Sequence, residues 1–340
     1  MGRTITSEEE YRPRPSRRGS RPRTKRRPDY SDAVRGVVVS VDRGRYRVIA
    51  GDDLASASAE APVVTCVRAA HLRRRPIVPG DRVSMTGDTS GDDGTLARIV
   101  TVEERTTVLR RSSDDTDPTE RVVVANADTL VVVTATTDPE PSWGFLDRTT
   151  VAAFDAGIRP LIAVTKTDLH PATEVRDRFA DVDVEIVECG YDAAGLPRTD
   201  ALLPHLTDRQ SVLLGHSGVG KSTLINRLVP GADRATGEVN ENTGTGRHTS
   251  SSTWALPLPQ GGWVVDTPGV RSFGLAHVDA DSVVAAFAEL TPATADCPRG
   301  CTHAEGAVGC ALDAWVASGE AGPSGGRRLR SLRRLLGNLT

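Results

Sequence analysis

Long apolar runs, disulfide-type cysteine patterns and lysine are all scarce in this sequence of 340 residues. No run of about 18 apolar residues occurs, which argues against a membrane-spanning helix. The arginine-rich N-terminus lacks the apolar stretch that a secretory signal needs. The sequence holds five cysteines, three of them between positions 297 and 310, a spacing that does not resemble a disulfide framework. We therefore expect a cytoplasmic protein.

Lysine is the scarcer basic residue. Lys25, Lys166 and Lys221 are the only lysines among 42 basic residues, and the rest are arginine. Where arginine fills nearly every basic position, a remaining lysine is a candidate for a place that requires a compact ammonium. The alternative is chance.

The chain is longer than one hydrophobic core usually serves, and its composition changes along its length. Residues 1–32 are predicted to be a disordered basic tail, because the first 30 residues hold ten Lys or Arg and almost nothing apolar. Such a tail fits either an electrostatic arm for RNA or a solubilising extension.

Residues 33–107 have the pattern of a small β-barrel. Residues 37–41 and 46–49 predict a hairpin, since both are apolar runs around a short turn. Further short strands are predicted at 63–67, 82–85 and 96–102. Five strands suit an oligonucleotide-binding (OB) fold, in which Arg73–Arg75 and Arg82 would form a basic face. Other small barrels also have five strands, so RNA binding stays open on this evidence.

Residues 115–275 predict an α/β domain. Short, continuously apolar runs alternate with helix-permissive segments, a pattern typical of a parallel sheet covered on both faces. These runs lie at 130–133, 161–164, 184–187, 212–214 and 264–265. Ligands bind such sheets beyond the carboxyl ends of the strands.

The segment 215–222 reads Gly-His-Ser-Gly-Val-Gly-Lys-Ser, which fits the phosphate-loop pattern between a strand and a helix. Glycines let backbone N–H groups approach phosphate oxygens, Lys221 would reach the β- and γ-phosphates, and the Ser222 hydroxyl would bind Mg²⁺. The alternative is an accidental glycine-rich turn. The predicted phosphate-binding residues are Gly215, Ser217, Gly218, Val219, Gly220, Lys221, Ser222 and Thr223.

Two more motifs follow predicted strands. In Asp266-Thr267-Pro268-Gly269, the aspartate can hold the metal ion and Gly269 can offer its N–H to the γ-phosphate. In Thr165-Lys166-Thr167-Asp168, the Asp168 carboxylate can accept the two N–H groups that guanine offers and adenine lacks, while the Lys166 stem lies over the base. This favours GTP over ATP; the alternative is an exposed charged loop.

Residues 276–340 predict a helical metal-binding domain. Cys297, Cys301, His303 and Cys310 supply three thiolates and an imidazole within a short segment, a set that suits structural zinc. The alternative is unpaired reduced cysteines. In residues 327–336, leucines recur at spacings of three and four between arginines. Such a basic amphipathic helix can lie on a membrane or a protein groove, contact RNA, or dock as an ordinary terminal helix.

The guanine motif precedes the phosphate loop, and this order is typical of circularly permuted GTPases. With the strand-rich N-terminal part and the Cys/His cluster, residues 33–335 resemble the RsgA (YjeQ) family of small-subunit ribosome biogenesis GTPases. The resemblance implies a GTPase that binds the small (30S) ribosomal subunit and its rRNA late in maturation. It further implies hydrolysis of GTP to GDP and phosphate with Mg²⁺, ribosome-stimulated turnover and one structural Zn²⁺.

Carried over by this resemblance, residues 246–251 match the first switch and residues 188–190 a loop that supports the base through Cys189 and Gly190. Two residues depart from the family pattern: Thr165 stands where Asn is usual and Cys189 where Ser is usual. The Asn replacement predicts a weaker contact between the guanine motif and the phosphate loop.

The group that activates water is assigned by the same analogy. Val270 follows Gly269 where many regulatory GTPases have glutamine, which predicts slow unassisted hydrolysis. His248 is the catalytic candidate, together with Lys221, because a neutral imidazole can position water; the alternative is an exposed loop histidine. Thr249 is favoured over Ser250 as the switch ligand for Mg²⁺.

Three functions fit these motifs. The first is a monomeric GTP hydrolase that acts on the small ribosomal subunit without membrane contact. The second is an RNA-binding switch that uses GTP occupancy with little catalysis, and the third is a P-loop kinase. Val270 keeps the second function open. Asp168 and the Cys/His cluster argue against the third.

Overall fold

The computed structural model describes residues 30–54, 61–111, 121–180, 182–232, 253–267, 278, 280–285 and 287–337. Residues 1–29 of the predicted basic tail, the first switch (246–251) and residues 268–277 lie outside this described part. Over the described residues, every helix is too short or too polar to span a bilayer.

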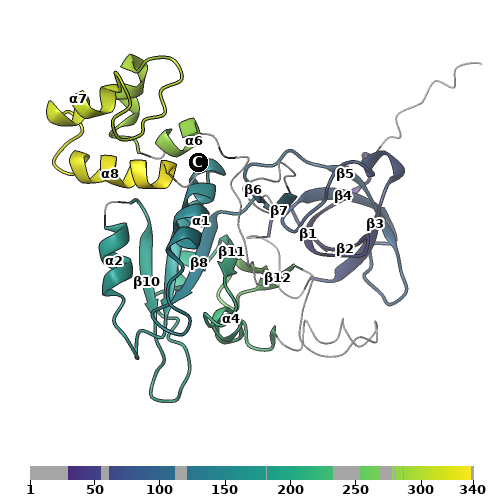
Figure 1. The fold of residues 1–340 in the computed structure, drawn as a ribbon. Helices are drawn as coiled ribbons and strands as arrows, with labels where there is room; N and C mark the ends of the chain where they lie inside the picture. The colour runs from purple at the N-terminus through teal and green to yellow at the C-terminus, as the bar shows by residue number, and fades with distance from the viewer. Residues whose placement is uncertain are drawn as a thin grey trace, which may run out of the picture. The chain divides into compact units, whose positions relative to one another are not determined.

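The first five strands close into a barrel (Figure 1). They are β1 (Val34–Asp42), β2 (Arg45–Ala50), β3 (Val63–Arg68), β4 (Arg82–Gly87) and β5 (Ala97–Val102), with a short helix η1 (Ala70–Leu72) after β3. β1 pairs with β2 and β4, and β3 pairs with β2 and β5. The β4–β5 pair completes the ring, so every strand has two neighbours. Alternating apolar side chains fill the interior, among them Val38, Val48, Val64, Val83 and Ile99.

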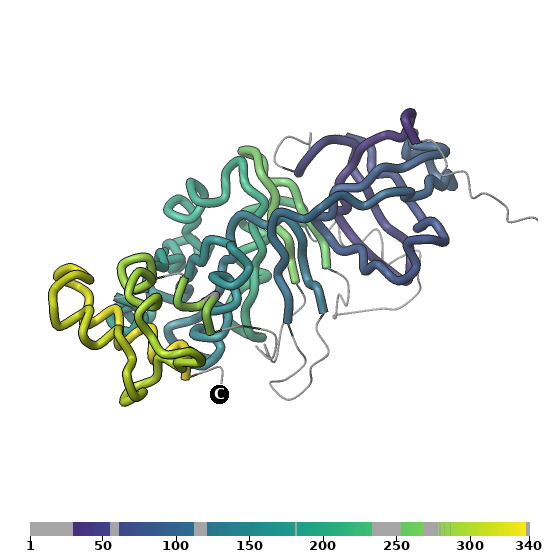
Figure 2. Tube along the Cα trace, turned by 90° about the horizontal axis from the view of Figure 1, so that it is seen from above, coloured from purple at the N-terminus to yellow at the C-terminus, as the bar shows by residue number. Residues whose placement is uncertain are grey.

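A separate hairpin follows the barrel (Figure 2). It consists of β6 (Val108–Arg111) and β7 (Arg121–Ala125), which pair antiparallel. This hairpin occupies the stretch between the predicted barrel and the predicted α/β domain.

Five parallel strands form the central sheet, namely β8 (Thr129–Ala135), β9 (Arg159–Thr165), β10 (Glu185–Cys189), β11 (Gln210–Gly215) and β13 (Trp263–Asp266). The order is β10-β9-β8-β11-β13, and β12 (Trp254–Pro257) adds an antiparallel strand beside β13. Helices α1 (Trp143–Asp155), α2 (Thr173–Phe179), α3 (Leu203–Leu206) and α4 (Lys221–Leu228) connect the strands. Every residue of β8 and of β11 is buried, as expected for a sheet covered on both faces.

The barrel is tightly joined to the start of β11. The Gln210 side chain donates to the Ala125 carbonyl over 2.7 Å, and the backbone N–H of Ala125 donates to the Pro79 carbonyl over 3.0 Å. A Cβ on Gly80 would lie 2.0 Å from the Ala125 carbonyl oxygen, so only glycine fits there. At the other edge of the core, β12 pairs with β1 at Ser40, and Arg47 lies over the Trp254 ring.

The C-terminal part is helical, with α6 (Ala280–Ala285), η2 (Thr291–Asp296), α7 (Ala311–Ala317) and α8 (Gly325–Leu336). The leucines of α8 at 329, 332, 335 and 336 are buried, which identifies it as a docked terminal helix and not a free amphipathic arm. The predicted fold class, an OB-like β-barrel followed by an α/β nucleotide-binding core and a helical Cys/His domain, is confirmed.

Candidate functional site

The phosphate loop lies between β11 and α4, at the carboxyl edge of the sheet. β11 ends at Gly215 and α4 begins at Lys221, with Gly220 in the left-handed region at φ +87°. A residue with a side chain would be strained there. Leu224, Ile225 and Leu228 of α4 are buried, and this packing fixes the loop. The Ser217, Ser222 and Thr223 side chains remain exposed at its mouth.

Lys221 links the phosphate loop to the motif at the end of β13. Its ammonium contacts the Asp266 carboxylate and donates to the Thr267 carbonyl over 2.8 Å. β11 and β13 are neighbours, with Leu213 opposite Asp266, so the sheet itself brings these groups together. Gly269, His248 and Thr249 lie outside the described residues.

Thr165 joins the guanine motif to the phosphate loop. Its hydroxyl donates to the Val219 carbonyl over 2.6 Å, and the Thr134 carbonyl lies 3.1 Å from the same oxygen. Thr165 and Val219 are both nearly fully buried. The threonine therefore retains a direct hydrogen bond between the two motifs, at the point where the replacement of asparagine predicted a weakened contact.

The loop after β10 packs closely on the guanine motif. A Cβ on Gly190 would lie 2.5 Å from the Thr167 hydroxyl and 2.9 Å from the Asp168 nitrogen, so a side chain is excluded. The backbone N–H of Tyr191 donates to Asp168 Oδ1 over 2.8 Å and orients this exposed carboxylate. A carboxylate oxygen accepts more than one hydrogen bond, so Asp168 can also accept N–H groups of a base.

Cys189 and Lys166 occupy different environments beside this loop. Burial raises the pKa of Cys189 to about 12, so its thiol is neutral and belongs to the core. Lys166 has a left-handed backbone at φ 57°, and its ammonium contacts the Asp138 carbonyl. The lysine side chain thus extends across the surface beside the guanine motif.

Two residues of this region, Tyr191 and His216, were not among the predicted site residues. The Tyr191 hydroxyl lies 3.7 Å from the position a Cβ on Gly220 would occupy, so the tyrosine reaches from the guanine motif to the phosphate loop. The His216 ring packs on Phe145 of α1, with centroids 4.2 Å apart. Burial, assisted by the nearby Arg148 charge, lowers the pKa of His216, which favours the neutral ring.

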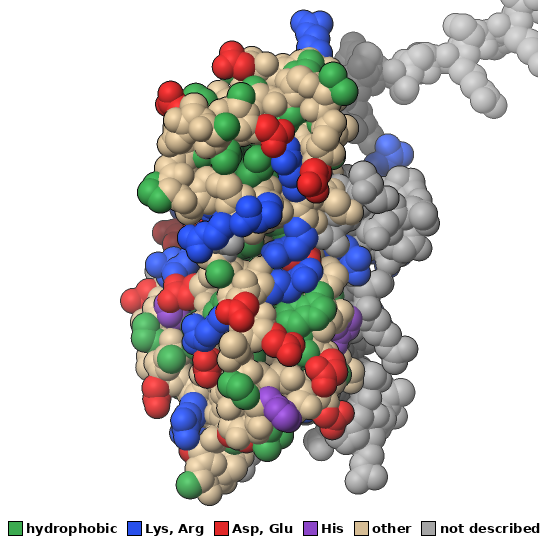
Figure 3. All heavy atoms as spheres, turned by 60° about the vertical axis from the view of Figure 1, so that its left-hand side comes forward, with side chains coloured by type: hydrophobic (Ala, Val, Ile, Leu, Met, Phe, Trp, Pro, Cys, Tyr) green, Lys and Arg blue, Asp and Glu red, His purple; other side chains and the backbone are tan. Residues whose placement is uncertain are grey.

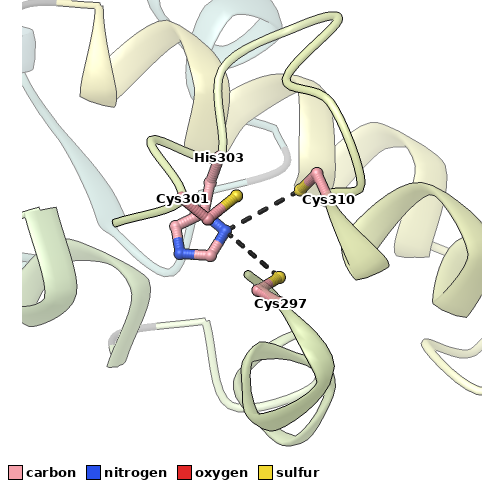
Figure 4. Close-up of side chains that lie close together, drawn as sticks. All are labelled: Cys297, Cys301, His303 and Cys310. Carbon is pink, nitrogen blue, oxygen red and sulfur yellow. Dashed lines mark hydrogen bonds between the residues drawn. The ribbon is translucent and has the colours of Figure 1, made fainter. Parts of the chain in front are cut away.

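The predicted metal ligands converge in the C-terminal part (Figure 4). The ligand atoms of Cys297, Cys301, His303 and Cys310 all lie within 4.8 Å of one another. His303 Nδ1 is 3.7 Å from the Cys297 sulfur and 3.8 Å from the Cys310 sulfur. Zinc–sulfur bonds of about 2.3 Å in a tetrahedron place ligands roughly 3.8 Å apart. The group therefore fits a tetrahedral metal ion with no open position.

Surrounding groups hold these ligands in place. The backbone N–H of Ala311 points at the Cys297 sulfur over 3.3 Å. Arg333 of α8 donates to the His303 carbonyl over 3.2 Å and is paired with Asp313 at 2.8 Å. Burial raises the pKa of Cys310 to about 11, so a bound cation would be needed to keep it as thiolate.

Comparisons with known proteins agree with this geometry. The family model for the RsgA GTPase matches residues 102–276. The small ribosomal subunit biogenesis GTPase RsgA of Ralstonia pickettii is 36% identical over 260 residues, which cover 74% of this chain and 80% of that protein.

Two solved structures share the fold. The crystal structure of YjeQ from Thermotoga maritima aligns with a TM-score of 0.62 and 24% identity, covering 90% of this chain and 98% of that one. The structure of YloQ, described as a circularly permuted GTPase, aligns with a TM-score of 0.58 and 21% identity over 92% of this chain and 97% of that one. With a matched family model and a relative more than one-third identical over most of its length, the chain belongs to the RsgA GTPase family.

Proposed function

We propose that this protein binds GTP at the carboxyl edge of the central sheet and hydrolyses it to GDP and phosphate. The observation that carries the proposal is the hydrogen bond from the Thr165 hydroxyl to the Val219 carbonyl. This hydrogen bond holds the guanine motif beside the phosphate loop, so one guanine nucleotide can contact both.

Each motif has one role in this proposal. Asp168 and the Gly190 loop hold the guanine, with Lys166 along the base. Backbone N–H groups of residues 215–223 cradle the phosphates, and Lys221 releases Asp266 to bind the β- and γ-phosphates. A bound Mg²⁺ would neutralise phosphate charge, and Ser222, Thr249 and Asp266 are the residues that would hold it.

Hydrolysis depends on the residue that positions water. Val270 cannot orient water, because its side chain is aliphatic. His248 in the first switch takes this role. Turnover by the isolated protein is therefore slow, and a partner that places His248 against the attacking water accelerates it.

The proposed partner is the small ribosomal subunit, on which the protein acts late in maturation as a cytoplasmic monomer. The named relative is a small ribosomal subunit biogenesis GTPase. Arg73, Arg74 and Arg75 are exposed together on the barrel, and Arg82 is half-buried in β4. Arginines of this kind bind RNA phosphates.

We further propose the domain division 33–107, 115–275 and 276–340, after the basic tail 1–32, with zinc as the structural metal of the last domain. In this order the second switch leads directly into the metal-binding domain. A nucleotide-dependent shift near Gly269 would then move whatever that domain contacts.

Co-sedimentation with purified small subunits tests the partner. The protein loaded with a non-hydrolysable GTP analogue should bind subunits more tightly than the GDP-loaded protein, and Lys221→Ala should remove the difference. Equal binding in both nucleotide states would contradict the proposal. Tight GTP-dependent binding without any turnover would instead favour the occupancy switch with little catalysis.

A further inference from the structure

A buried carboxylate lies behind the nucleotide site. Asp147 of α1 is 1% exposed and belongs to none of the nucleotide or metal motifs. It pairs with Arg178 of α2 at 2.6 Å and with Arg334 of α8 at 3.4 Å. Removing a charge from water is costly, and a buried ion pair is weak evidence of added stability.

These three residues tie together elements far apart in the sequence. Arg334 also donates to the Arg178 carbonyl over 2.8 Å, and its guanidinium lies 5.3 Å from the centre of the Phe179 ring. The Arg178 guanidinium lies 5.2 Å from the Trp143 ring at the start of α1. Figure 3 shows Lys and Arg side chains gathered in a band across one face of the molecule. Arg334 therefore docks the C-terminal helix onto both α1 and α2.

Both of these helices border the nucleotide site. Phe145, two residues before Asp147, packs on His216 of the phosphate loop at 4.2 Å. α2 begins at Thr173, shortly after Asp168 of the guanine motif. A displacement of the phosphate loop can thus reach Asp147 through the first turn of α1. A displacement of the guanine motif can reach it through α2.

The contact between α1 and the phosphate loop borders a surface pocket. This pocket of about 130 Å³ is lined among others by Pro139, Ser142, Phe145 and His216. Ser142 is exposed, so the pocket opens to solvent and the first turn of α1 is not packed on all sides.

We propose that Asp147 is a positioning residue that couples nucleotide binding to the docking of the C-terminal helix. The proposal rests on the proposed function, since it requires a guanine nucleotide in the site. Binding shifts the first turn of α1, and this changes how Asp147 meets Arg334. Because such coupling is reciprocal, weakening the Arg334 contact must change nucleotide affinity, although Arg334 does not touch the nucleotide.

The test is a fluorescence titration of mant-GDP and of a mant-labelled GTP analogue with the full chain. Arg334→Gln should change at least one dissociation constant about 5-fold or more, the lower end of typical coupling. Arg330→Gln is the matched control, because Arg330 is exposed on the same helix, and it should leave both constants within about 2-fold of the parent values. If Arg334→Gln, like Arg330→Gln, keeps both dissociation constants within about 2-fold of the parent values, the proposal is overturned.

A second readout separates coupling from mere stabilisation. Trp143 lies under the Arg178 guanidinium, so nucleotide should change its emission, and Trp143→Phe should remove the part of the emission change that this tryptophan contributes. In Arg334→Gln the emission change should be altered as well. A lower melting temperature with unaltered nucleotide affinity and emission would overturn the coupling and leave only a structural pair. A parent protein that binds no guanine nucleotide would overturn the proposed function together with the coupling.

Discussion

Replacing Thr165 by valine removes one hydroxyl at nearly constant shape and leaves the Val219 carbonyl without its donor. The hydrogen bond is short, at 2.6 Å, and both residues are nearly fully buried, so water cannot replace the donor. A buried polar group left unsatisfied costs about 1–3 kcal/mol. If most of this cost falls on the geometry of the phosphate loop, about 1–2 kcal/mol of nucleotide binding is lost. The dissociation constant for mant-GDP should then rise about 5- to 30-fold.

Two variants control this experiment. Thr165→Ser keeps the hydroxyl and should bind within about 3-fold of the parent protein. Thr136→Val removes a 2.8 Å hydrogen bond to the Lys166 carbonyl, which touches the guanine motif but not the phosphate loop, and should weaken binding less than Thr165→Val. Parent-like affinity of Thr165→Val in a folded protein would refute the argument that this hydroxyl holds the two motifs together.

Other expected outcomes concern separate parts of the molecule. Gly190→Ala places a Cβ 2.5 Å from the Thr167 hydroxyl and should displace the backbone. The affinity for mant-GDP should therefore fall about 10-fold or more. Unchanged affinity would show that the loop accommodates the methyl group without disturbing the site. Purified protein should contain one zinc per chain by elemental analysis, and Cys297→Ser should lower both zinc content and melting temperature; unchanged values in the variant would argue against this cluster as the site. Burial lowers the pKa of His216, so its contribution to stability is complete above about pH 6.5 and is lost as the pH falls through the folded-state pKa. Between about pH 7.5 and 5.5, the melting temperature of His216→Gln should therefore fall less than that of the parent protein. An equal fall in both proteins would contradict this.

The sequence predicted the strands that carry the motifs, because each is a short run of apolar residues ending in a distinctive polar group. The strand over 161–164 and its Thr165–Asp168 motif lie as expected at the end of β9. β12 was not predicted, since a four-residue strand ending in Pro257 has no clear period. The hairpin of β6 and β7 was missed for a related reason, because both strands are short and β6 has only two apolar residues.

The contacts that connect distant motifs were beyond sequence reasoning. Thr165 looked like a weakened position because its residue type differs from the family pattern, and only the proximity of Val219 shows what the hydroxyl does. Asp147 is one acidic residue in an ordinary amphipathic helix until Arg178 and Arg334 are placed against it. For the C-terminal helix, the sequence left RNA, a membrane, a protein groove and ordinary docking open. In the structure, Arg328, Arg333 and Arg334 pair with acidic residues of the chain itself.

Release of phosphate from GTP, followed with and without purified small ribosomal subunits and beside ATP, tests the central claim most directly. The account predicts slow GTP turnover by the protein alone, strong stimulation by the subunits and little hydrolysis of ATP. His248→Ala should remove most of the stimulated rate. Equal hydrolysis of ATP and GTP would contradict the role of Asp168 in choosing guanine, and turnover that the subunits leave unchanged would contradict the proposed partner.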